Sequence, residues 1–130
     1  MTFCKEERLC SRRTIDKLYA EGHRLMAFPF SVQWIRVDRN TADPPCQIMI
    51  VAPKRRFRHA VDRNRVRRLT RECYRMRKGP FYEFLQNTGI NIALSLVYVH
   101  NEIPTFEQLG HKMDKLMLAL EHDISAKSES

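Results

Sequence analysis

Residues 60–78, AVDRNRVRRLTRECYRMRK, constrain the fold most, because one helix there must carry eight Lys or Arg residues and only two acids. At about 100° per residue, the apolar side chains share one narrow stripe and most basic ones share the opposite side. The stripe consists of Val66, Leu69, Cys73 and Met76. The opposite side consists of Asn64, Arg67, Arg68, Arg71, Arg75 and Lys78, flanked by Arg63 and Arg65. The pattern predicts a helix that buries one side and presents guanidinium groups on the other.

The charge pattern of this helix differs from that of a face that only meets water. Solvated faces usually pair acids with bases at i,i+4, whereas Arg67–Arg71 and Arg71–Arg75 are like-charge pairs. Every basic residue between Lys54 and Lys78 is Arg, whose planar fork suits phosphates and stacks on bases. A membrane-surface helix would need a wider apolar face. We therefore expect a polyanionic partner; DNA stays open, and RNA recognised by shape and backbone fits at least as well.

The net charge of +8 comes from one segment of the chain. Residues 53–78 hold twelve Lys or Arg and two acids, and the rest of the chain holds eleven Lys or Arg and thirteen acids. An excess so local is typical of a nucleic-acid contact surface.

The length of 130 residues suits a single core, so we expect one domain over residues 1–123 and a disordered tail over 124–130. The longest apolar run, Ile92–Val99, is too short to span a bilayer, and the first residues resemble no targeting signal. We therefore expect a cytoplasmic protein with no membrane contact. Four cysteines without metal-ligand spacing are expected as reduced thiols: Cys4, Cys10, Cys46 and Cys73.

Hydrophobic periodicity and turn residues predict the order of elements. We expect a helix at 11–21 ended by Gly22, strands at 28–37 and 46–52, the basic helix at 60–78 stopped by Gly79–Pro80, a helical turn at 81–85, a strand at 91–100 and a helix at 105–123 capped by Thr105. Turn residues at 38–45 favour a hairpin between the first two strands, and a split of 28–37 would add a further strand. The order indicates a small α+β sandwich.

The segment Val61–Arg75, VDRNRVRRLTRECYR, resembles the signature of the bacterial ribonuclease P protein component, an RNR motif that opens a basic helix. The flanking elements agree in order and spacing, so the resemblance covers roughly residues 8–122. It implies a two-layer α/β sandwich of αβββαβα order, with a central four-stranded sheet and a left-handed β-α-β crossover. General handedness rules would not predict that crossover.

The resemblance also implies a function and a set of contact residues. The family's protein is the small subunit of a ribonucleoprotein that removes the 5′ leader from precursor tRNA, while its RNA carries catalysis and the Mg²⁺ ions. Docking on that RNA is implied for Arg63, Asn64, Arg65, Arg67, Arg68, Arg71 and Arg75. A cleft between the first helix and the sheet is implied to hold the single-stranded leader.

The candidate leader-binding residues are Tyr19, whose ring suits stacking on an unpaired base, and Lys54 at the rim of the cleft. Ile15 stands where the family usually has Phe, and Pro53 replaces a basic or polar residue, so these two departures affect the leader contacts most. Trp34 is either a further cleft residue or, as is commoner for a strand Trp, a core residue.

No constellation for protein-based hydrolysis is present, because the acids are scattered and the five His residues lie in different segments. We therefore expect the polypeptide alone to be inactive and to bind no cofactor itself. The expected partners are ribonuclease P RNA and the precursor tRNA leader, with no protein partner required. The alternative is a structural RNA-binding protein of ribosomal type, which would share the basic helix but show no preference for precursor over mature tRNA.

Overall fold

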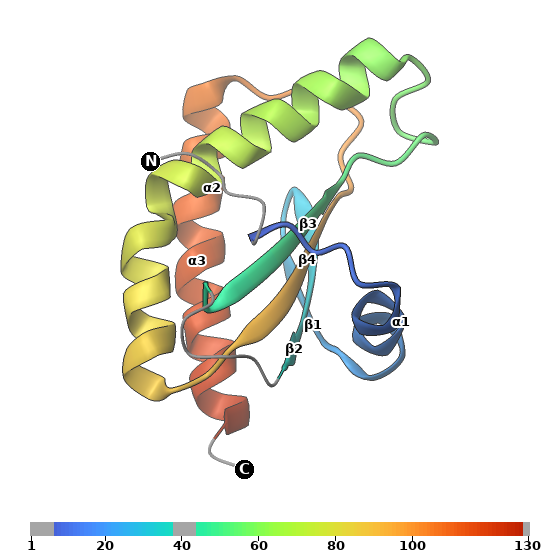
Figure 1. The fold of residues 1–130 in the computed structure, drawn as a ribbon. Helices are drawn as coiled ribbons and strands as arrows, with labels where there is room; N and C mark the ends of the chain where they lie inside the picture. The colour runs from blue at the N-terminus through green and yellow to red at the C-terminus, as the bar shows by residue number, and fades with distance from the viewer. Residues whose placement is uncertain (1–6, 38–43, 129–130) are drawn as a thin grey trace.

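The computed structural model describes residues 7–37 and 44–128, and the hairpin turn expected at 38–45 falls mostly outside them, as does Cys4. Figure 1 shows the arrangement of the helices and strands. In chain order they are α1 (Arg12–Glu21), β1 (His23–Ala27), β2 (Phe30–Arg36), β3 (Cys46–Val51), α2 (Ala60–Thr88), β4 (Ile92–Tyr98) and α3 (Phe106–Ser128). The expected αβββαβα order is confirmed.

The four strands form one sheet in the order β1-β2-β4-β3. β1 and β2 are antiparallel and joined by a short turn at Phe28–Pro29, so the extra strand comes before that turn and not from a split within 28–37. β2 pairs with β4, and β3 pairs with β4 in parallel. The hairpin expected between the strands at 28–37 and 46–52 is therefore wrong, because these strands are β2 and β3, and β4 lies between them in the sheet.

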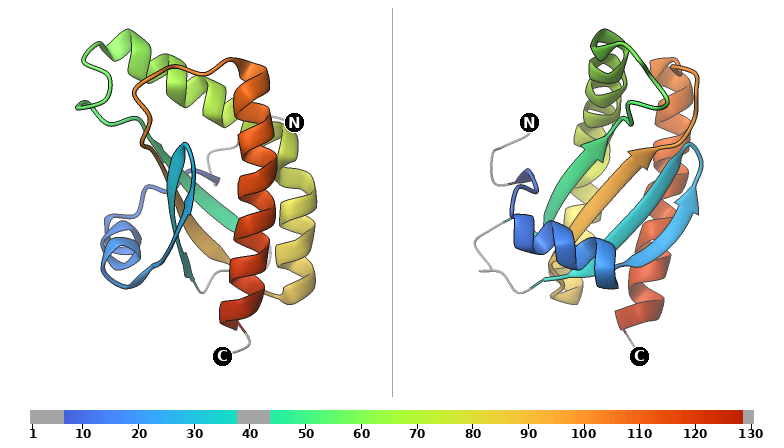
Figure 2. Two further views of the ribbon diagram at one scale, coloured as in Figure 1. Left: turned by 180° about the vertical axis from the view of Figure 1, so that it is seen from behind. Right: turned by 90° about the vertical axis from the view of Figure 1, so that its right-hand side faces the viewer.

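The parallel unit β3-α2-β4 has a left-handed crossover. In the right-hand view of Figure 2, β3 and β4 point upward, α2 lies behind the sheet, and β4 lies to the right of β3. Seen from the α2 side, β4 therefore lies to the left of β3, which makes the crossover left-handed. This is the hand that the resemblance implies, although nearly all such connections are right-handed.

Helices cover both faces of the sheet, with α2 and α3 on one face and α1 on the other (Figure 1). Strand alternation decides which side chains meet each layer. Phe30 and Trp34 of β2 belong to the main core with α2 and α3. Ile35, on the opposite face of the same strand, joins a smaller cluster with Leu9 and with Leu18 of α1.

α2 does not stop at Gly79–Pro80 as expected but continues through both residues to Thr88, for a total length of 29 residues. Pro80 costs about 3 kcal/mol in a helix interior, whereas fully burying Phe81 and Leu85 contributes about 1.5–3 kcal/mol each. Tertiary burial therefore outweighs the local signal. Figure 1 shows α2 changing direction near its middle, which an interior Pro commonly causes. The helix ends at Gly89, whose φ of 70° suits glycine.

A buried ion pair ties the N-terminal segment to α2. Lys78 Nζ donates to both carboxylate oxygens of Glu7, at 2.7 and 2.8 Å, and the hydroxyl of Tyr82 donates to Glu7 at 2.5 Å. Two residues after Glu7, the backbone N–H of Leu9 donates to the carbonyl of Ile48 in the edge strand β3 (3.0 Å). The expectation that Lys78 belongs to the exposed basic side is therefore wrong, because Lys78 is buried and paired with the carboxylate of Glu7.

α3 begins with a capping box, in which Thr105 Oγ1 accepts from the N–H of Gln108 and Gln108 Oε1 accepts from the N–H of Thr105, both at 3.1 Å. The helix runs to Ser128, and Ile124 is fully buried in the main core. The disordered tail expected from residue 124 is therefore wrong for residues 124–128. No helix within residues 7–37 and 44–128 has the length and apolar character needed to cross a membrane.

Candidate nucleic-acid interface

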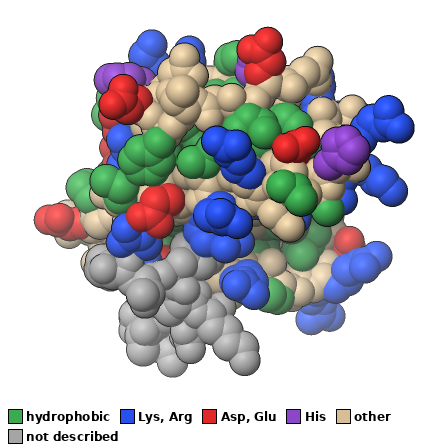
Figure 3. All heavy atoms as spheres, turned by 90° about the horizontal axis from the view of Figure 1, so that it is seen from above, with side chains coloured by type: hydrophobic (Ala, Val, Ile, Leu, Met, Phe, Trp, Pro, Cys, Tyr) green, Lys and Arg blue, Asp and Glu red, His purple; other side chains and the backbone are tan. Residues whose placement is uncertain are grey.

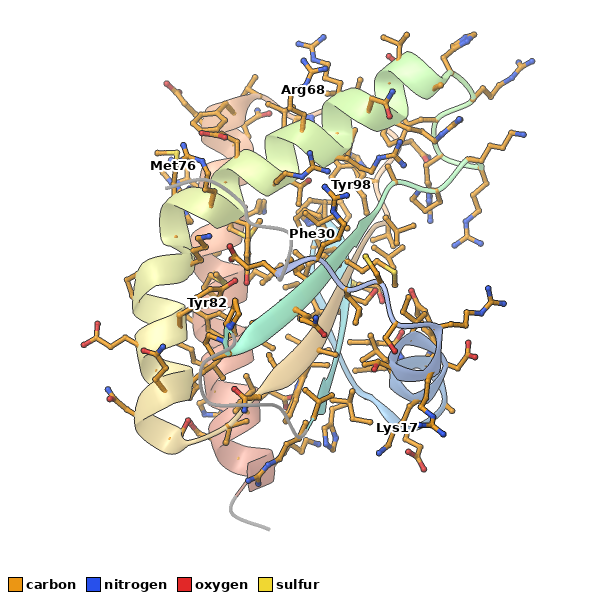
Figure 4. The ribbon with its side chains drawn as sticks, viewed as in Figure 1. Lys17, Phe30, Arg68, Met76, Tyr82 and Tyr98 are labelled. Carbon is orange, nitrogen blue, oxygen red and sulfur yellow. The ribbon has the colours of Figure 1, made fainter. Side chains whose placement is uncertain are left out.

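The first half of α2 extends over one end of the sheet, with one side in the core and the other open (Figure 1). Val66, Thr70, Cys73 and Tyr74 are fully buried. Met76, expected on the apolar stripe, is 57% exposed. It lies where α2 bends (Figure 4). Beyond Cys73 the buried positions of the helix are Tyr74, Lys78, Phe81 and Leu85, so Met76 no longer lies on the buried side.

The opposite side of this half-helix carries the predicted basic row. Arg65, Arg68 and Arg71 are exposed, and Arg67 and Arg75 are half-buried. Figure 4 shows Arg68 pointing away from the sheet. We call Asn64, Arg65, Arg67, Arg68, Arg71 and Arg75 the arginine face.

Arg63 plays a different part from the rest of the row. Its Nη1 donates to the carbonyl of Phe57 (2.9 Å) and of Arg58 (3.1 Å). It therefore holds the end of the basic loop against the start of α2. That loop presents Lys54, Arg55 and Arg58 as exposed residues beside the arginine face.

Arg67 and Arg75 of the arginine face are held by side chains of the same helix. Arg67 Nη2 donates to Asn64 Oδ1 at 2.5 Å, so Asn64 orients this guanidinium group. Arg75 forms a two-point ion pair with Glu72, whose pKa is lowered by the hydrogen bond from Arg75. Glu72 thus orients one guanidinium and removes one net charge from this surface.

Arg77 lies outside the arginine face, because its Nε donates to Asp114 of α3 at 2.6 Å. Its Nη1 donates to the carbonyl of Cys73 (3.2 Å), so Arg77 joins α2 to α3. Figure 3, which looks down on this end of the molecule, shows Lys and Arg side chains spread across the surface, with Asp and Glu side chains among them. The excess of positive charge fits a phosphate backbone.

The second candidate surface lies where α1 covers the sheet. The hydroxyl of Tyr19 lies 3.2 Å from Ser95 Oγ of β4, and the residue as a whole is 41% exposed. In the sheet Ser95 is paired with Gln33, whose buried Nε2 has no hydrogen-bond partner among the described residues. The ring of Tyr19 is therefore held in position by its hydroxyl while it stays open for stacking.

The other predicted cleft residues, Ile15, Lys54 and Trp34, do not all lie on the same surface as Tyr19. Ile15 packs into the small cluster on the α1 face. Lys54 is exposed in the loop after β3. Trp34 lies on the opposite face of the sheet, 3% exposed, and its Nε1 donates to Asp123 Oδ2 at 2.8 Å. Trp34 is therefore a core residue and does not share a cleft with Tyr19.

Ser95 and Gln33 were missed by the sequence interpretation. Their signal is present, since each is a polar residue inside an otherwise apolar strand, at the alternate positions that face α1. Alternation alone does not reveal which helix covers that face.

Among residues 7–37 and 44–128, no group of three or more His, Cys, Asp or Glu is placed to hold a metal ion.

Comparison with known proteins gives a consistent result. A family model described as Ribonuclease P matches residues 3–121. The ribonuclease P protein component of Porphyromonas gingivalis is 32% identical over 124 residues, which cover 95% of this chain and 90% of that protein. The same component of Chlorobium phaeobacteroides is 30% identical over 87 residues, 62% of this chain and 60% of the relative.

Solved structures show the same fold. The RNase P protein of Staphylococcus aureus superimposes with a TM-score of 0.66 at 18% identity, over 87% of this chain and 94% of the other. The RNase P protein from Thermotoga maritima superimposes with a TM-score of 0.62 at 21% identity, over 85% of this chain and 94% of the other. From the family model and the sequence relatives, the chain belongs to the ribonuclease P protein family.

Proposed function

We propose that this protein is the protein subunit of ribonuclease P, the ribonucleoprotein that removes the 5′ leader from precursor tRNA. Family membership supports the assignment. The single observation that carries the mechanism is the arginine face, a row of guanidinium groups on a helix whose other side is anchored in the core. In this proposal the arginine face binds the RNA subunit, and the surface around Tyr19 receives the leader.

The arginine face contributes binding free energy through the phosphate backbone. Each phosphate that an Arg neutralises releases counterions, so affinity falls with salt by about 0.7–0.9 log units per contact per log unit of salt. Arg65 and Arg68 project as exposed donors, while Arg67 is oriented by Asn64. Arg63 acts differently, as a positioning residue that supports the basic loop through the carbonyls it binds.

The α1 face contributes substrate selection. Tyr19 offers an exposed ring held by Ser95, and stacking on an unpaired base contributes about 1–3 kcal/mol. Mature tRNA lacks the leader, so this contact favours the precursor. Ile15 packs against the small cluster that contains Leu18, so in this proposal it helps to hold α1 on the sheet and does not stack on the leader.

Catalysis is assigned to the RNA subunit, with Mg²⁺ bound by RNA, and the polypeptide alone is inactive in this proposal. The role of the protein is to bind RNA, neutralise charge and position the leader. We place this activity in the cytoplasm, where thiols such as those of Cys10 and Cys73 remain reduced.

Reconstitution tests the proposal. The protein is added to ribonuclease P RNA at low Mg²⁺, and release of the 5′ leader from precursor tRNA is measured, with the protein alone as a control. Arg68→Ala should reduce the salt slope of RNA binding by about one unit, whereas Arg36→Ala, an exposed Arg at the end of β2, should not. An unchanged slope in Arg68→Ala would refute the assignment of the arginine face.

The leader contact has its own test. Tyr19→Ala should keep RNA docking but reduce the preference of the assembled enzyme for precursor over mature tRNA. RNA binding without any precursor preference in the wild-type assembly would instead favour a structural RNA-binding protein.

A further inference from the structure

A pocket outside both proposed surfaces lies at the end of the sheet where the β1–β2 turn, the end of β4 and the start of α3 meet. Its volume is about 280 Å³, and its lining includes Phe28, Tyr98, His100 and Lys112. This volume is at the lower end for small-molecule pockets, so it suits one planar group and not a larger ligand.

The walls of the pocket are aromatic and fixed. Phe28 is 53% exposed although it is a large apolar side chain, and its ring centroid lies 5.1 Å from that of His100. The turn that carries Phe28 is held by the N–H of Val99, which donates to the carbonyl of Pro29 at 2.8 Å. Tyr98 donates its hydroxyl to the carbonyl of Glu102 (2.7 Å) and so fixes the other wall. An exposed ring on a rigid support is what base stacking requires.

Positive charge borders these aromatic walls. Lys112 lines the pocket from α3. Arg56 donates from Nη1 to Asn101, the residue after His100, at 3.0 Å. The buried Nε of Arg56 has no hydrogen-bond partner within the described parts of the chain. The pocket thus combines a stacking surface with one cation in its lining, Lys112, for an adjoining phosphate, while Arg56 adds positive charge beyond the lining, next to Asn101.

Glu102, an acidic residue in the pocket lining, makes a ligand that is only an anion unfavourable. Glu102 lines the pocket, and its carboxylate lies 3.7 Å from His100 Nε2. A carboxylate here disfavours a bare anion but can accept a hydrogen bond from the amino group of a base. A nucleotide satisfies both features, because its base carries donors and its phosphate carries the charge.

We infer that this pocket binds one unpaired RNA nucleotide, with its base stacked on Phe28 and its phosphate beside Lys112. The site lies on the α3 side of the molecule and involves no residue of the arginine face or of the α1 face. It therefore stands independently of the proposed function.

The test uses the full free chain and a single-stranded penta-adenylate, followed by chemical shifts of ¹⁵N-labelled amides at low salt. Binding should shift the amides of Phe28, His100 and Ile103. Phe28→Leu keeps an apolar side chain without the ring and should weaken the affinity reported by these amides at least about fivefold. The matched control, Phe106→Leu, changes a 40% exposed Phe outside the pocket and should leave the affinity unchanged.

Two results would overturn the inference. One is a set of shifts confined to α1 and α2, which would place all RNA binding on the surfaces of the proposed function and leave the pocket for an apolar partner. The other is equal affinity in Phe28→Leu and wild type, which would remove stacking as the cause. Because no ribonuclease P RNA is present, neither result bears on the reconstitution assay.

Discussion

The buried ion pair of Lys78 and Glu7 gives the sharpest test of how this chain is held together. Lys78 is 4% exposed at its side chain and Glu7 is 2% exposed, and the two groups are joined by two hydrogen bonds. In Lys78→Met the carboxylate of Glu7 would stay buried beside the hydroxyl of Tyr82, without the ammonium group that balances its charge. Removing one partner of a buried pair costs about 3–5 kcal/mol.

That cost is a large share of the free energy of unfolding, which is about 5–15 kcal/mol for a typical domain. The double variant Glu7→Leu/Lys78→Met removes both charges, and apolar replacement of a buried pair is often neutral. It should therefore recover most of the loss and retain a deficit of about 1 kcal/mol, because the hydroxyl of Tyr82 loses its acceptor.

Urea unfolding followed by fluorescence of Trp34, the single Trp of the chain, measures these differences. Lys115→Met, which changes an exposed Lys of α3, is the control and should stay within about 0.5 kcal/mol of wild type. The reasoning is refuted when Lys78→Met loses less than about 1 kcal/mol, or when the double variant is no more stable than Lys78→Met.

Further predictions concern single contacts. Glu72→Gln should tighten RNA binding and steepen its salt dependence, because it releases Arg75 and removes an acid from the arginine face; filter binding over a salt series would show no change if this pair did not matter. The pKa of Glu72 is lowered below its ordinary 4.5 by Arg75, so the stabilisation from this pair is complete above pH 4.5 and is lost as the pH falls through the lower folded value. An NMR titration should give a midpoint below 4.5 for Glu72, and this midpoint should rise in Arg75→Ala. Tyr19→Phe removes the bond to Ser95 and should cost at most about 1 kcal/mol in urea unfolding while keeping precursor preference, unlike Tyr19→Ala. Gly22→Ala should destabilise the protein in thermal unfolding, since a Cβ there would lie 2.2 Å from the carbonyl oxygen of Leu18.

Local patterns predicted much of this molecule because they depend on neighbours in the chain. The helical period places Arg68 opposite Val66 and Cys73 whatever the rest of the chain does, and the structure buries the latter two and exposes the former. The caps at Gly22 and Thr105 follow from the same local chemistry. Family membership was likewise predicted from a local segment, the RNR motif within Val61–Arg75.

The predictions that failed each depended on a partner far away in the chain. Lys78 has the period of an exposed residue, but Glu7, 71 positions earlier, provides a carboxylate inside the protein. Pro80 carries a helix-stop signal, but the burial of Phe81 against the sheet and α3 keeps α2 continuous.

The sheet order and the faces of its strands were also decided only by tertiary structure. Alternation shows that Trp34 and Gln33 point to opposite sides, but only the packing of α1 and α3 determines which side is core and which carries Tyr19. The sequence by itself determined the arginine face, because a helix sets its own period from local backbone hydrogen bonds. The tertiary structure decided which of those charges stay outside, because burial and ion pairing join residues that the chain separates.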